Sequence, residues 1–385
     1  MEPRMREPVL TEYLFQKASR KGIPFSGTFE LTPVCNMNCK MCYVRMSKSE
    51  QESIRPLRTG KEWIELAKKA KDAGMVYLLL TGGEPFLHPD FPFIMQSLKE
   101  MGFVVTINSN GTMIDEKTVE WLKEAPPIRI NITLYGASDE TYARLCGNPK
   151  GFTKTTKAIQ LLREAGIMVR VNCSITPYNK EDIQGIFQFA TEKDMPIQVS
   201  SYMFPPLRRD ASMIGQNKRL TPEEAAYYMA YSEFLLRGRE YFLERSSNIP
   251  DIVETDDMCM DIGDGMRCRA GRCSFWITWE GKMTACGMFP PKKAPNVFEE
   301  GFETSWERVK RETSEIRLPA KCAGCSVKDT CRTCAAMVVT ETGAFDKVPV
   351  YRCEMMKAYP KQRKKVELLA YAEKIPSDGK DDDIK

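Results

Sequence analysis

The chain has 385 residues, of which 42% are hydrophobic and 28% charged, and its 56 basic and 52 acidic residues leave a net charge of +4. This near balance lacks the basic excess of a nucleic-acid-binding protein, and no apolar run is long enough to cross a membrane. Because no secretory signal opens the sequence, we expect a cytoplasmic protein, in which disulfides are rare. The 14 cysteines, beside a single histidine, therefore indicate metal ligation by thiolates.

The first half of the chain alternates between strand and helix patterns. Helices are expected at residues 60–74 and 156–166, for example, and each of these segments ends in a glycine. The alternation predicts right-handed connections and a parallel sheet, either open or curled into a partial barrel. In such sheets the reactive groups lie at the C-terminal ends of the strands. The expected strands are residues 28–32, 75–81, 103–109, 128–134, 167–175 and 197–203.

Three cysteines directly follow the first expected strand. In the stretch TPVCNMNCKMCYVRM (residues 32–46), Cys35, Cys39 and Cys42 have the spacing C-x3-C-x2-C. Three thiolates can hold a four-iron cluster and leave one iron open to an outside ligand. A zinc knuckle that borrows a distant fourth ligand, or three reduced core thiols, would have the same spacing.

The second expected strand ends in TGGEP (residues 81–85). Paired glycines at a strand end let the backbone approach a ligand closely, and Glu84 can accept hydrogen bonds from an ammonium group. A tight turn with a solvated Glu84 is the alternative interpretation. The only histidine, His88, follows in the same segment, and we interpret it as a turn residue bonded to backbone rather than a catalytic base.

The C-terminal half has a different character. Residues 221–245 are predicted to form one long helix, and residues 246–257 a polar, acidic linker. Nine cysteines follow from Cys259 to Cys353 with few periodic segments between them, which is typical of a region that folds around metals. Their number suits two fully ligated centres, and zinc and iron–sulfur clusters fit the spacing equally well. The tail at residues 376–385 is expected to be disordered.

The cysteine triplet after the first strand, the GGEP turn after the second and the six-fold alternation together resemble the radical S-adenosylmethionine (radical SAM) superfamily, over residues 26–235. In that family SAM chelates the free iron of a 4Fe–4S cluster, and its reductive cleavage gives a 5′-deoxyadenosyl radical that takes a hydrogen atom from the substrate. The resemblance implies an α/β fold whose core is a partial (β/α)6 TIM-like barrel.

The resemblance also implies contacts to SAM. Gly82, Gly83 and Glu84 would hold its methionyl amino group, Thr133 its ribose and Arg144 its carboxylate. The sequence departs from the family at two positions. Met41 precedes the third cysteine where an aromatic residue is usual, and Tyr135 replaces an acidic residue that often follows the fourth strand.

The C-terminal cysteines resemble the SPASM extension of the superfamily, which carries two auxiliary 4Fe–4S clusters. The segment FWITWEGKMTACG (residues 275–287) matches its strand, turn glycine and cysteine, and the resemblance implies three 4Fe–4S clusters in all. Cys259 is an alternative to Cys273 as a ligand, and Cys146 and Cys173 stay unassigned. By analogy the ligands are Cys268, Cys273, Cys286 and Cys334 for the first auxiliary cluster, and Cys322, Cys325, Cys331 and Cys353 for the second.

The resemblance implies an enzyme, a radical SAM oxidoreductase that oxidises or crosslinks a side chain of a peptide or protein and receives electrons from a flavodoxin or ferredoxin. Peptide epimerisation, with Cys259 as a candidate hydrogen donor, is an alternative. A sulfatase-maturase-like activity is disfavoured by Gly287, which stands where that subgroup has an aspartate. A non-catalytic zinc-ribbon binding module is the alternative from another class. The expected domains are an N-terminal extension (1–25), a radical SAM core (26–235), a SPASM domain (255–357) and a C-terminal helix with a disordered tail (358–385).

Overall fold

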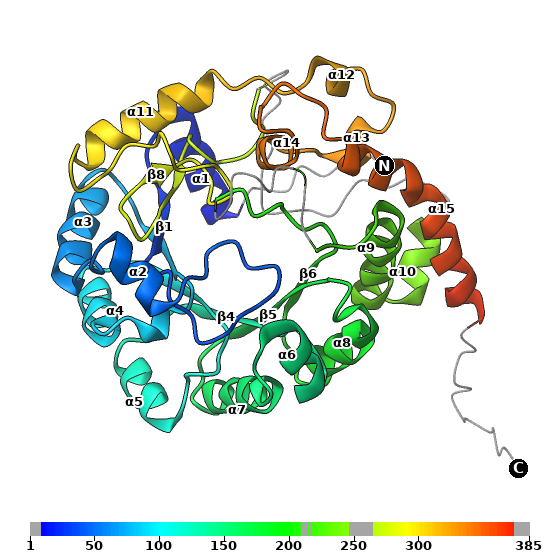
Figure 1. Ribbon diagram of the computed structural model, residues 1–385, viewed down its shortest axis with the longest axis horizontal. Coiled ribbons are helices and arrows are strands. Elements are labelled where there is room, and N and C mark those ends of the chain that lie inside the picture. Colours follow the sequence, from blue (N-terminus) through cyan, green and yellow to red (C-terminus); the bar gives the residue numbers. More distant parts are fainter. Residues whose placement is uncertain (1–8, 209–214, 216–217, 246–264, 373–385) are drawn as a thin grey trace, which may run out of the picture.

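The computed structural model describes residues 9–208, 215, 218–245 and 265–372. Six parallel strands curl around a central space with helices on the outside (Figure 1), and each strand pairs with the next one along the chain. Each strand overlaps its predicted range, so the partial barrel expected from the sequence is confirmed. The strands are β1 (Ser26–Glu30), β2 (Tyr77–Thr81), β3 (Val104–Ser109), β4 (Arg129–Thr133), β5 (Val169–Ser174) and β6 (Ile197–Ser200).

The connections between these strands contain helices that begin and end at local sequence signals. Thr59 and Glu62 form a reciprocal capping box at the start of α3. Gly74, Gly102 and Gly166 all have positive φ where the chain leaves a helix, as expected. These helices are α2 (Lys48–Ile54), α3 (Gly60–Asp72), α4 (Phe91–Glu100), α5 (Glu116–Glu124), α6 (Asp139–Cys146), α7 (Gly151–Glu164) and α8 (Ile183–Glu192), with short 3-10 turns η1 (Pro85–Leu87) and η2 (Lys180–Asp182).

The strands direct apolar side chains toward the helices and polar side chains into the barrel. In β3, Val105 and Ile107 belong to the main hydrophobic core, whereas Thr106 and Asn108 line cavities of the barrel interior. Successive side chains of a strand point to opposite faces, so this alternation follows from the sequence. The apolar core therefore lies between sheet and helices, and the interior is left polar.

The prediction of one long helix at residues 221–245 is wrong. The structure has two helices there, α9 (Pro222–Arg237) and α10 (Arg239–Glu244), separated by Gly238 with a φ of 82°. This positive φ is readily adopted by glycine and ends the helical path. The break brings Phe242 against Phe234, with ring centroids 5.6 Å apart. A lone glycine is tolerated in a helical pattern, so the sequence did not reveal the break.

The helix α15 (Val350–Ala372) packs along α9 and α10. Arg363 ties the three together, because it donates to a carboxylate oxygen of Glu233 at 2.7 Å and to the carbonyl of Phe242 at 3.1 Å. The domain boundary predicted at residues 357/358 falls inside α15, and Cys353 lies near the start of the helix. The predicted linker at 246–257, Cys259 and the tail at 376–385 lie outside the described residues.

The cysteine-rich segment adds two strands to the barrel sheet. β7 (Ser274–Ile277) pairs in parallel with β1, and β8 (Met283–Thr284) returns antiparallel to β7 after a turn at Gly281, which has a φ of 92°. The predicted hairpin is therefore present, and it extends the sheet to eight strands in the order β6-β5-β4-β3-β2-β1-β7-β8.

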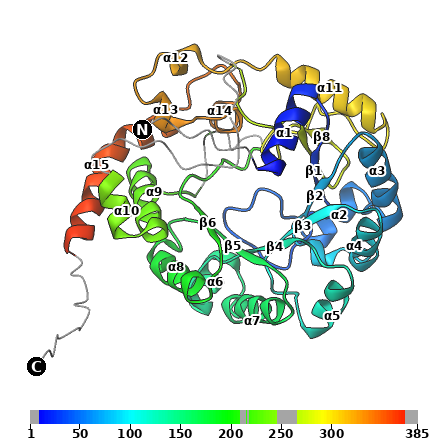
Figure 2. The same cartoon turned by 180° about the vertical axis from the view of Figure 1, so that it is seen from behind.

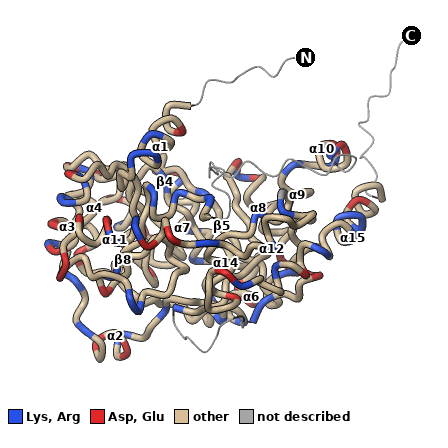
Figure 3. Tube along the Cα trace, turned by 90° about the horizontal axis from the view of Figure 1, so that it is seen from above, with Lys and Arg blue, Asp and Glu red and all other residues tan. Residues whose placement is uncertain are grey.

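The remaining helices surround the two ends of this sheet. α1 and α2 project from opposite faces of the molecule (Figure 3), so α1 lies on the side where the strands begin and α2 on the side where they end. Figures 1 and 2 show α12, α13 and α14 between the two ends of the curled sheet. No helix among the described residues is long and apolar enough to span a bilayer. The bounds are α1 (Leu10–Lys21), α11 (Phe302–Ser314), α12 (Ala320–Ala323), α13 (Lys328–Cys331) and α14 (Ala335–Thr342).

Phe275 of β7 fastens the hairpin to the barrel. Its ring lies against Gly27 of β1, where an added Cβ would come within 2.4 Å of the ring. On its other side, Phe302 and Trp306 of α11 have ring centroids 5.3 and 5.9 Å away. The buried ring therefore joins β1, β7 and α11 in one core.

We expect Phe275→Ala to lower the free energy of unfolding by about 3–5 kcal/mol, because the substitution leaves a cavity between β1 and α11. Phe93→Ala is the matched control, since Phe93 is 47% exposed, and should cost less than about 1 kcal/mol. Denaturant unfolding of both variants measures the difference. Equal small losses would show that the hairpin is only loosely attached to the barrel.

Candidate active site

A cavity of about 360 Å³ lies at the C-terminal ends of the barrel strands. The loop between β1 and α2 crosses the mouth of the barrel (Figure 1) and brings Cys35, Cys39 and Cys42 to this cavity. Three thiols predicted from spacing alone thus meet the strand ends in space. We call this space the mouth cavity. The polar residues of its wall are Tyr43, Thr81, Asn108, Ser109, Asn110, Thr133, Tyr135, Asn172, Ser174, Ser200 and Tyr202.

The loop with the thiols and the glycine turn are joined backbone to backbone. The N–H of Gly83 donates to the carbonyl of Thr32 at 2.6 Å, and the N–H of Glu84 donates to the carbonyl of Val34 at 2.9 Å. A Cβ on Gly82 would come within 2.4 Å of the Thr32 carbonyl oxygen, and one on Gly83 within 2.5 Å of the Val34 carbonyl oxygen. The paired glycines therefore permit a close backbone approach, and its partner in the structure is the cysteine loop, whereas the sequence analysis expected a ligand.

Cys39 is held by the end of α6. The N–H groups of Asn38 and Lys40, on either side of it, donate to the carbonyls of Cys146 and Leu145 at 2.8 and 3.1 Å. Cys146 is fully buried, and its thiol together with burial raises the pKa of Cys39 well above its usual value. A fourth thiol thus lies beside the triplet. Spacing could not indicate this neighbour, because Cys146 is 107 positions from Cys39.

Glu84 lies behind the turn rather than in the mouth cavity. Its side chain is fully buried and accepts hydrogen bonds from the Ser109 hydroxyl at 2.9 Å and the Asn110 N–H at 2.8 Å. Burial raises its pKa from 4.5 to about 7, although these hydrogen bonds oppose the rise. The expected solvated or ligand-facing carboxylate is instead a buried group that orders the end of β3. The glycines, not Glu84, face the cavity.

The other predicted residues divide between the cavity and the surface. Thr133, at the end of β4, lines the mouth cavity as expected. Arg144 lies on the exposed face of α6, where its guanidinium donates to the carbonyl of Tyr178 at 2.7 Å, and it does not line the cavity. His88 is a turn residue, as interpreted: its Nδ1 accepts from the N–H of Asp90 at 3.2 Å, and its Nε2 is 2.9 Å from the carbonyl of Arg58.

Sequence reasoning missed the polar strand ends of β5 and β6. Asn172, Ser174 and Ser200 face the cavity from alternate positions. The side-chain oxygen of Asn172 is buried and has no hydrogen-bond partner among the described residues. The sequence did contain a signal for these residues, because polar residues alternate with apolar ones in both strands. The same alternation is also typical of a strand with one solvated face, so it did not indicate a cavity.

Four of the C-terminal cysteines gather at a separate cavity of about 380 Å³. It lies beside α12, α13 and the start of α15. The four are the set predicted for the second auxiliary centre, Cys322, Cys325, Cys331 and Cys353.

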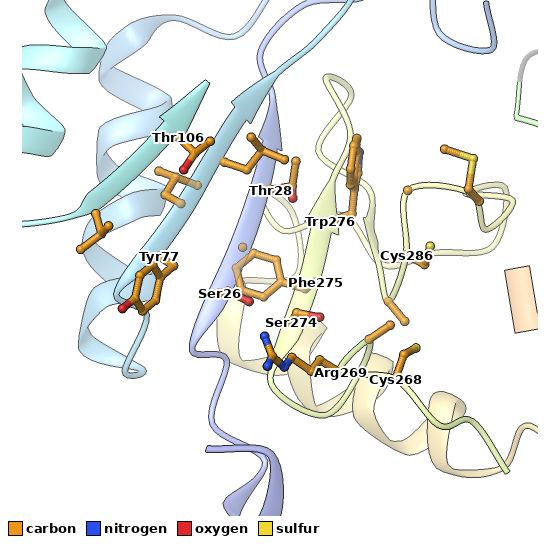
Figure 4. A pocket seen from close by; sticks show the side chains of 18 residues that line it. Ser26, Thr28, Tyr77, Thr106, Cys268, Arg269, Ser274, Phe275, Trp276 and Cys286 are labelled. Atoms are coloured by element: carbon orange, nitrogen blue, oxygen red, sulfur yellow. The ribbon is translucent and has the colours of Figure 1, made fainter. Parts of the chain in front are cut away.

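Cys268 and Cys286 border a third cavity, of about 420 Å³, beside β1 and β7 (Figure 4). Burial and the nearby Cys334 and Cys268 thiols raise the pKa of Cys286 to about 12, so three predicted ligands of the first auxiliary centre lie together. Cys273, the fourth predicted ligand, does not line this cavity. It is fully buried in a small core formed with residues of α1 and the segment that follows it.

The chain turns between Cys331 and Cys334, so that Cys331 lines the cavity of about 380 Å³ whereas Cys334 lies near Cys286. Arg332 has a φ of 41° and a ψ of 44°, a left-handed conformation. For a residue with a side chain this costs on the order of 1–2 kcal/mol and persists where the surroundings impose it. The buried Arg352 donates to the carbonyl of Cys331 at 2.5 Å and fixes the turn. This turn is compatible with the crossed arrangement that the resemblance implies for the two auxiliary centres.

Most cysteine side chains of these sets line cavities and do not converge on one position that a single metal ion could occupy. Among the described residues, no three Cys, His, Asp or Glu side chains converge as binding of a single metal ion would require. Zinc holds sulfur ligands at about 2.3 Å, which needs such convergence. A 4Fe–4S cluster is held through separate iron atoms, so its thiolates stand farther apart. Thiol sets that line cavities are therefore compatible with 4Fe–4S clusters.

Arg208, in the segment after β6, joins the barrel mouth to the cysteine-rich region. It donates to both carboxylate oxygens of Glu30 at 2.9 and 3.0 Å, and to the carbonyl of Gly287 at 2.9 Å. Glu30, the last residue of β1, is fully buried and also accepts from the Trp276 indole at 3.1 Å. A buried charge is costly unless paired, so these contacts hold three segments in one arrangement.

The pKa of Glu84 predicts a pH dependence of stability. The folded state binds the proton of the Glu84 carboxyl group more tightly than the unfolded chain does, so protonation of Glu84 stabilises the fold. This stabilisation is complete below about pH 4.5 and is lost as the pH rises through 7. We expect the free energy of unfolding of cluster-free protein to fall from pH 5 to pH 8, relative to Glu84→Gln, by on the order of 3 kcal/mol. Comparing the two proteins cancels His88, whose pKa is lowered by burial. Parallel pH profiles would contradict a raised pKa.

Comparison with known proteins agrees with this geometry. A model of the radical SAM superfamily matches residues 29–190. An AdoMet-dependent heme synthase of Methanosarcina barkeri is 26% identical over 82% of this chain and 93% of its own length. The subtilosin biosynthesis protein AlbA of Bacillus subtilis is 27% identical over 73% of this chain, and the match spans 59% of AlbA.

Among solved structures, Streptococcus suis SuiB bound to the precursor peptide SuiA superimposes with a TM-score of 0.66. The superposition covers 91% of this chain and 84% of that one at 18% sequence identity, so the likeness is one of fold. The matched region contains the cysteine triplet, the glycine turn, the end of β1 and the whole of β2, β3, β4 and β5. The chain is thus an enzyme with a radical SAM domain at residues 29–190, and its C-terminal cysteine-rich region resembles the SPASM type in the pattern of its cysteines.

Proposed function

We propose that this enzyme uses SAM to oxidise or crosslink a side chain of a peptide or protein, and that its substrate lies between the SAM site and the cysteine-rich region. The observation that carries the proposal is Met288. This residue lines both the mouth cavity and the cavity of Cys268 and Cys286, so the two spaces share a wall. A substrate in the mouth cavity would therefore lie next to the first auxiliary centre.

The residues of the mouth cavity suit a cluster and SAM. Cys35, Cys39 and Cys42 would hold the cluster, which with SAM supplies a 5′-deoxyadenosyl radical that takes a hydrogen atom from the substrate. The carbonyls of Gly82 and Gly83 accept no backbone hydrogen bond from the described residues, which leaves them available to a methionyl ammonium group. Thr133 and Asn172 would bind hydroxyl groups of the ribose. Arg144 could bind the carboxylate of SAM only if its guanidinium no longer donated to the carbonyl of Tyr178.

The lining of the mouth cavity favours a peptide over a tetrapyrrole. None of the described residues that line it is charged. A porphyrin bears carboxylate side chains, which a buried site would pair with cations. Amide and hydroxyl groups such as those of Asn108, Asn172 and Ser200 suit the uncharged donors and acceptors of a peptide backbone. AlbA and SuiB, whose names refer to a bacteriocin and a precursor peptide, are similar to this chain. The heme synthase is similar too, so a porphyrin must be tested.

The cysteines favour oxidation or crosslinking over epimerisation. Epimerisation needs a hydrogen donor near the substrate, and a thiol is a suitable one. Among the described residues, no cysteine outside the expected cluster ligands lines the mouth cavity. Cys146 and Cys173 are buried in the core. Cys259 remains the candidate donor. Substrate oxidation instead requires an electron acceptor, which a cluster at Cys268, Cys286 and Cys334 would provide, with Cys259 or Cys273 as its fourth ligand.

Anaerobically purified protein should contain about twelve iron atoms per chain, from three 4Fe–4S clusters. Replacing Cys35, Cys39 and Cys42 by alanine should leave about eight and abolish 5′-deoxyadenosine formation with dithionite, because no site remains that binds and reduces SAM. Cys173→Ala is the control and should retain the iron, since that thiol is buried in the core. About four iron atoms per wild-type chain, with zinc present, would contradict the auxiliary clusters.

The substrate assignment is tested by mass spectrometry. Enzyme, SAM and dithionite are incubated with a peptide encoded beside the gene, and in parallel with an iron porphyrin. A peptide product that has lost two hydrogen atoms is the expected result. Unchanged mass with solvent deuterium at one α-carbon would indicate epimerisation. Turnover of the porphyrin alone would overturn the peptide assignment.

A further inference from the structure

The cavity of the second auxiliary centre lies at the surface. Cys322, Cys325 and Cys353 are only partly buried. They lie in α12, in the turn between α12 and α13, and near the start of α15, respectively. Figure 1 shows α12 and α13 at the outer edge of the molecule, away from the loop that crosses the barrel mouth. A redox centre bound here would be accessible from outside without entering the mouth cavity.

Positively charged side chains surround this cavity. One acid, Glu354, lines it among the described side chains. Three of these side chains are lysines, namely Lys321, Lys328 and Lys357. They form no ion pair with any described acid, so their charge is available to a partner. We call the cations the basic collar, and its members are Arg267, Lys321, Lys328, Arg332 and Lys357.

The space inside the collar is apolar. Pro319, Val327, Val348 and Val350 line it, and Val350 is 62% exposed. The net charge of the whole chain is only +4, so a local excess of cations around an apolar centre is a distinct feature. Charged rims steer a partner of opposite sign and fix its orientation, while a small apolar centre allows a short-lived contact.

We infer that the basic collar is the docking surface for an acidic one-electron carrier protein of the flavodoxin or ferredoxin class, whose redox group would face Cys322 and Cys325. The inference rests on the proposed function, because it requires a cluster at these thiols. In each encounter the carrier loses one electron and the four-thiolate site gains it. After substrate oxidation the same surface returns one electron to an oxidised carrier. A nucleic acid fits this surface less well, because the cations encircle an apolar centre rather than follow a backbone.

The test is charge reversal. In the collar variant Lys321, Lys328 and Lys357 are replaced by glutamate. In the matched variant Lys61, Lys69 and Lys154, exposed residues of α3 and α7, are replaced in the same way, so the net charge is equal. Binding of a bacterial flavodoxin is measured by calorimetry at low salt, and 5′-deoxyadenosine formation is measured with either flavodoxin and its reductase or dithionite as reductant.

The collar variant should bind flavodoxin at least tenfold more weakly than wild type, and should lose at least tenfold in flavodoxin-driven rate. Its iron content and dithionite-driven rate should be unchanged. The matched variant should behave as wild type, and the wild-type affinity should fall with salt. Equal weakening in both variants, or none in the collar variant, would overturn the docking site.

Carbodiimide crosslinking of the wild-type protein to flavodoxin gives a second readout that needs no variant and no turnover. Crosslinks should involve Lys321, Lys328 or Lys357, and crosslinks confined to other lysines would overturn the inference. Failure of the proposed function is distinguishable, since it would show as absent 5′-deoxyadenosine with dithionite in wild type.

Discussion

The backbone contact between the ends of β1 and β2 is the constraint on which the rest of the site depends. Gly83 donates to the Thr32 carbonyl, and no Cβ fits at Gly82 or Gly83. This contact fixes the loop that carries Cys35, Cys39 and Cys42 over the mouth of the barrel. The buried Glu84 then connects the same turn to Ser109 and Asn110 at the end of β3. The ends of β1, β2 and β3 are thus held as one unit. The end of α6 holds Cys39 in place through backbone hydrogen bonds to the residues on either side of it.

The C-terminal region is built onto this unit and does not stand apart from it. β7 continues the sheet beside β1, and Phe275 fills the space above Gly27. The ion pair between Arg208 and Glu30 lies where β1 ends. The left-handed Arg332 lies between Cys331, which lines the cavity inside the basic collar, and Cys334, which lies near Cys286. The backbone strain at Arg332 and the buried ion pair between Arg208 and Glu30 both cost free energy that a hydrophobic core alone would not require. Both features lie between the cysteine sets.

The sequence was sufficient where a local pattern determines the structure. Strand and helix periodicity located all six barrel strands, and spacing identified the cysteine triplet, whereas the four cysteines inside the basic collar were grouped only by the family resemblance. It was insufficient where long-range packing decides. Gly238 ends a helix because Phe242 packs back on Phe234. Arg144 and Glu84 had suitable chemistry, yet one points to a surface carbonyl and the other is buried behind the turn. Cys273 fits a ligand spacing but lies in the core beneath α1.

The central claim is that SAM binds at one particular thiol set among three, the one at the barrel mouth. Electron paramagnetic resonance of the dithionite-reduced protein, recorded before and after addition of SAM, tests it most directly. SAM should change the signal of one cluster and leave those of the others unaltered, because only the triplet leaves an iron without a protein ligand. A spectrum that SAM does not change, or a change that persists when Cys35, Cys39 and Cys42 are all absent, would contradict the account.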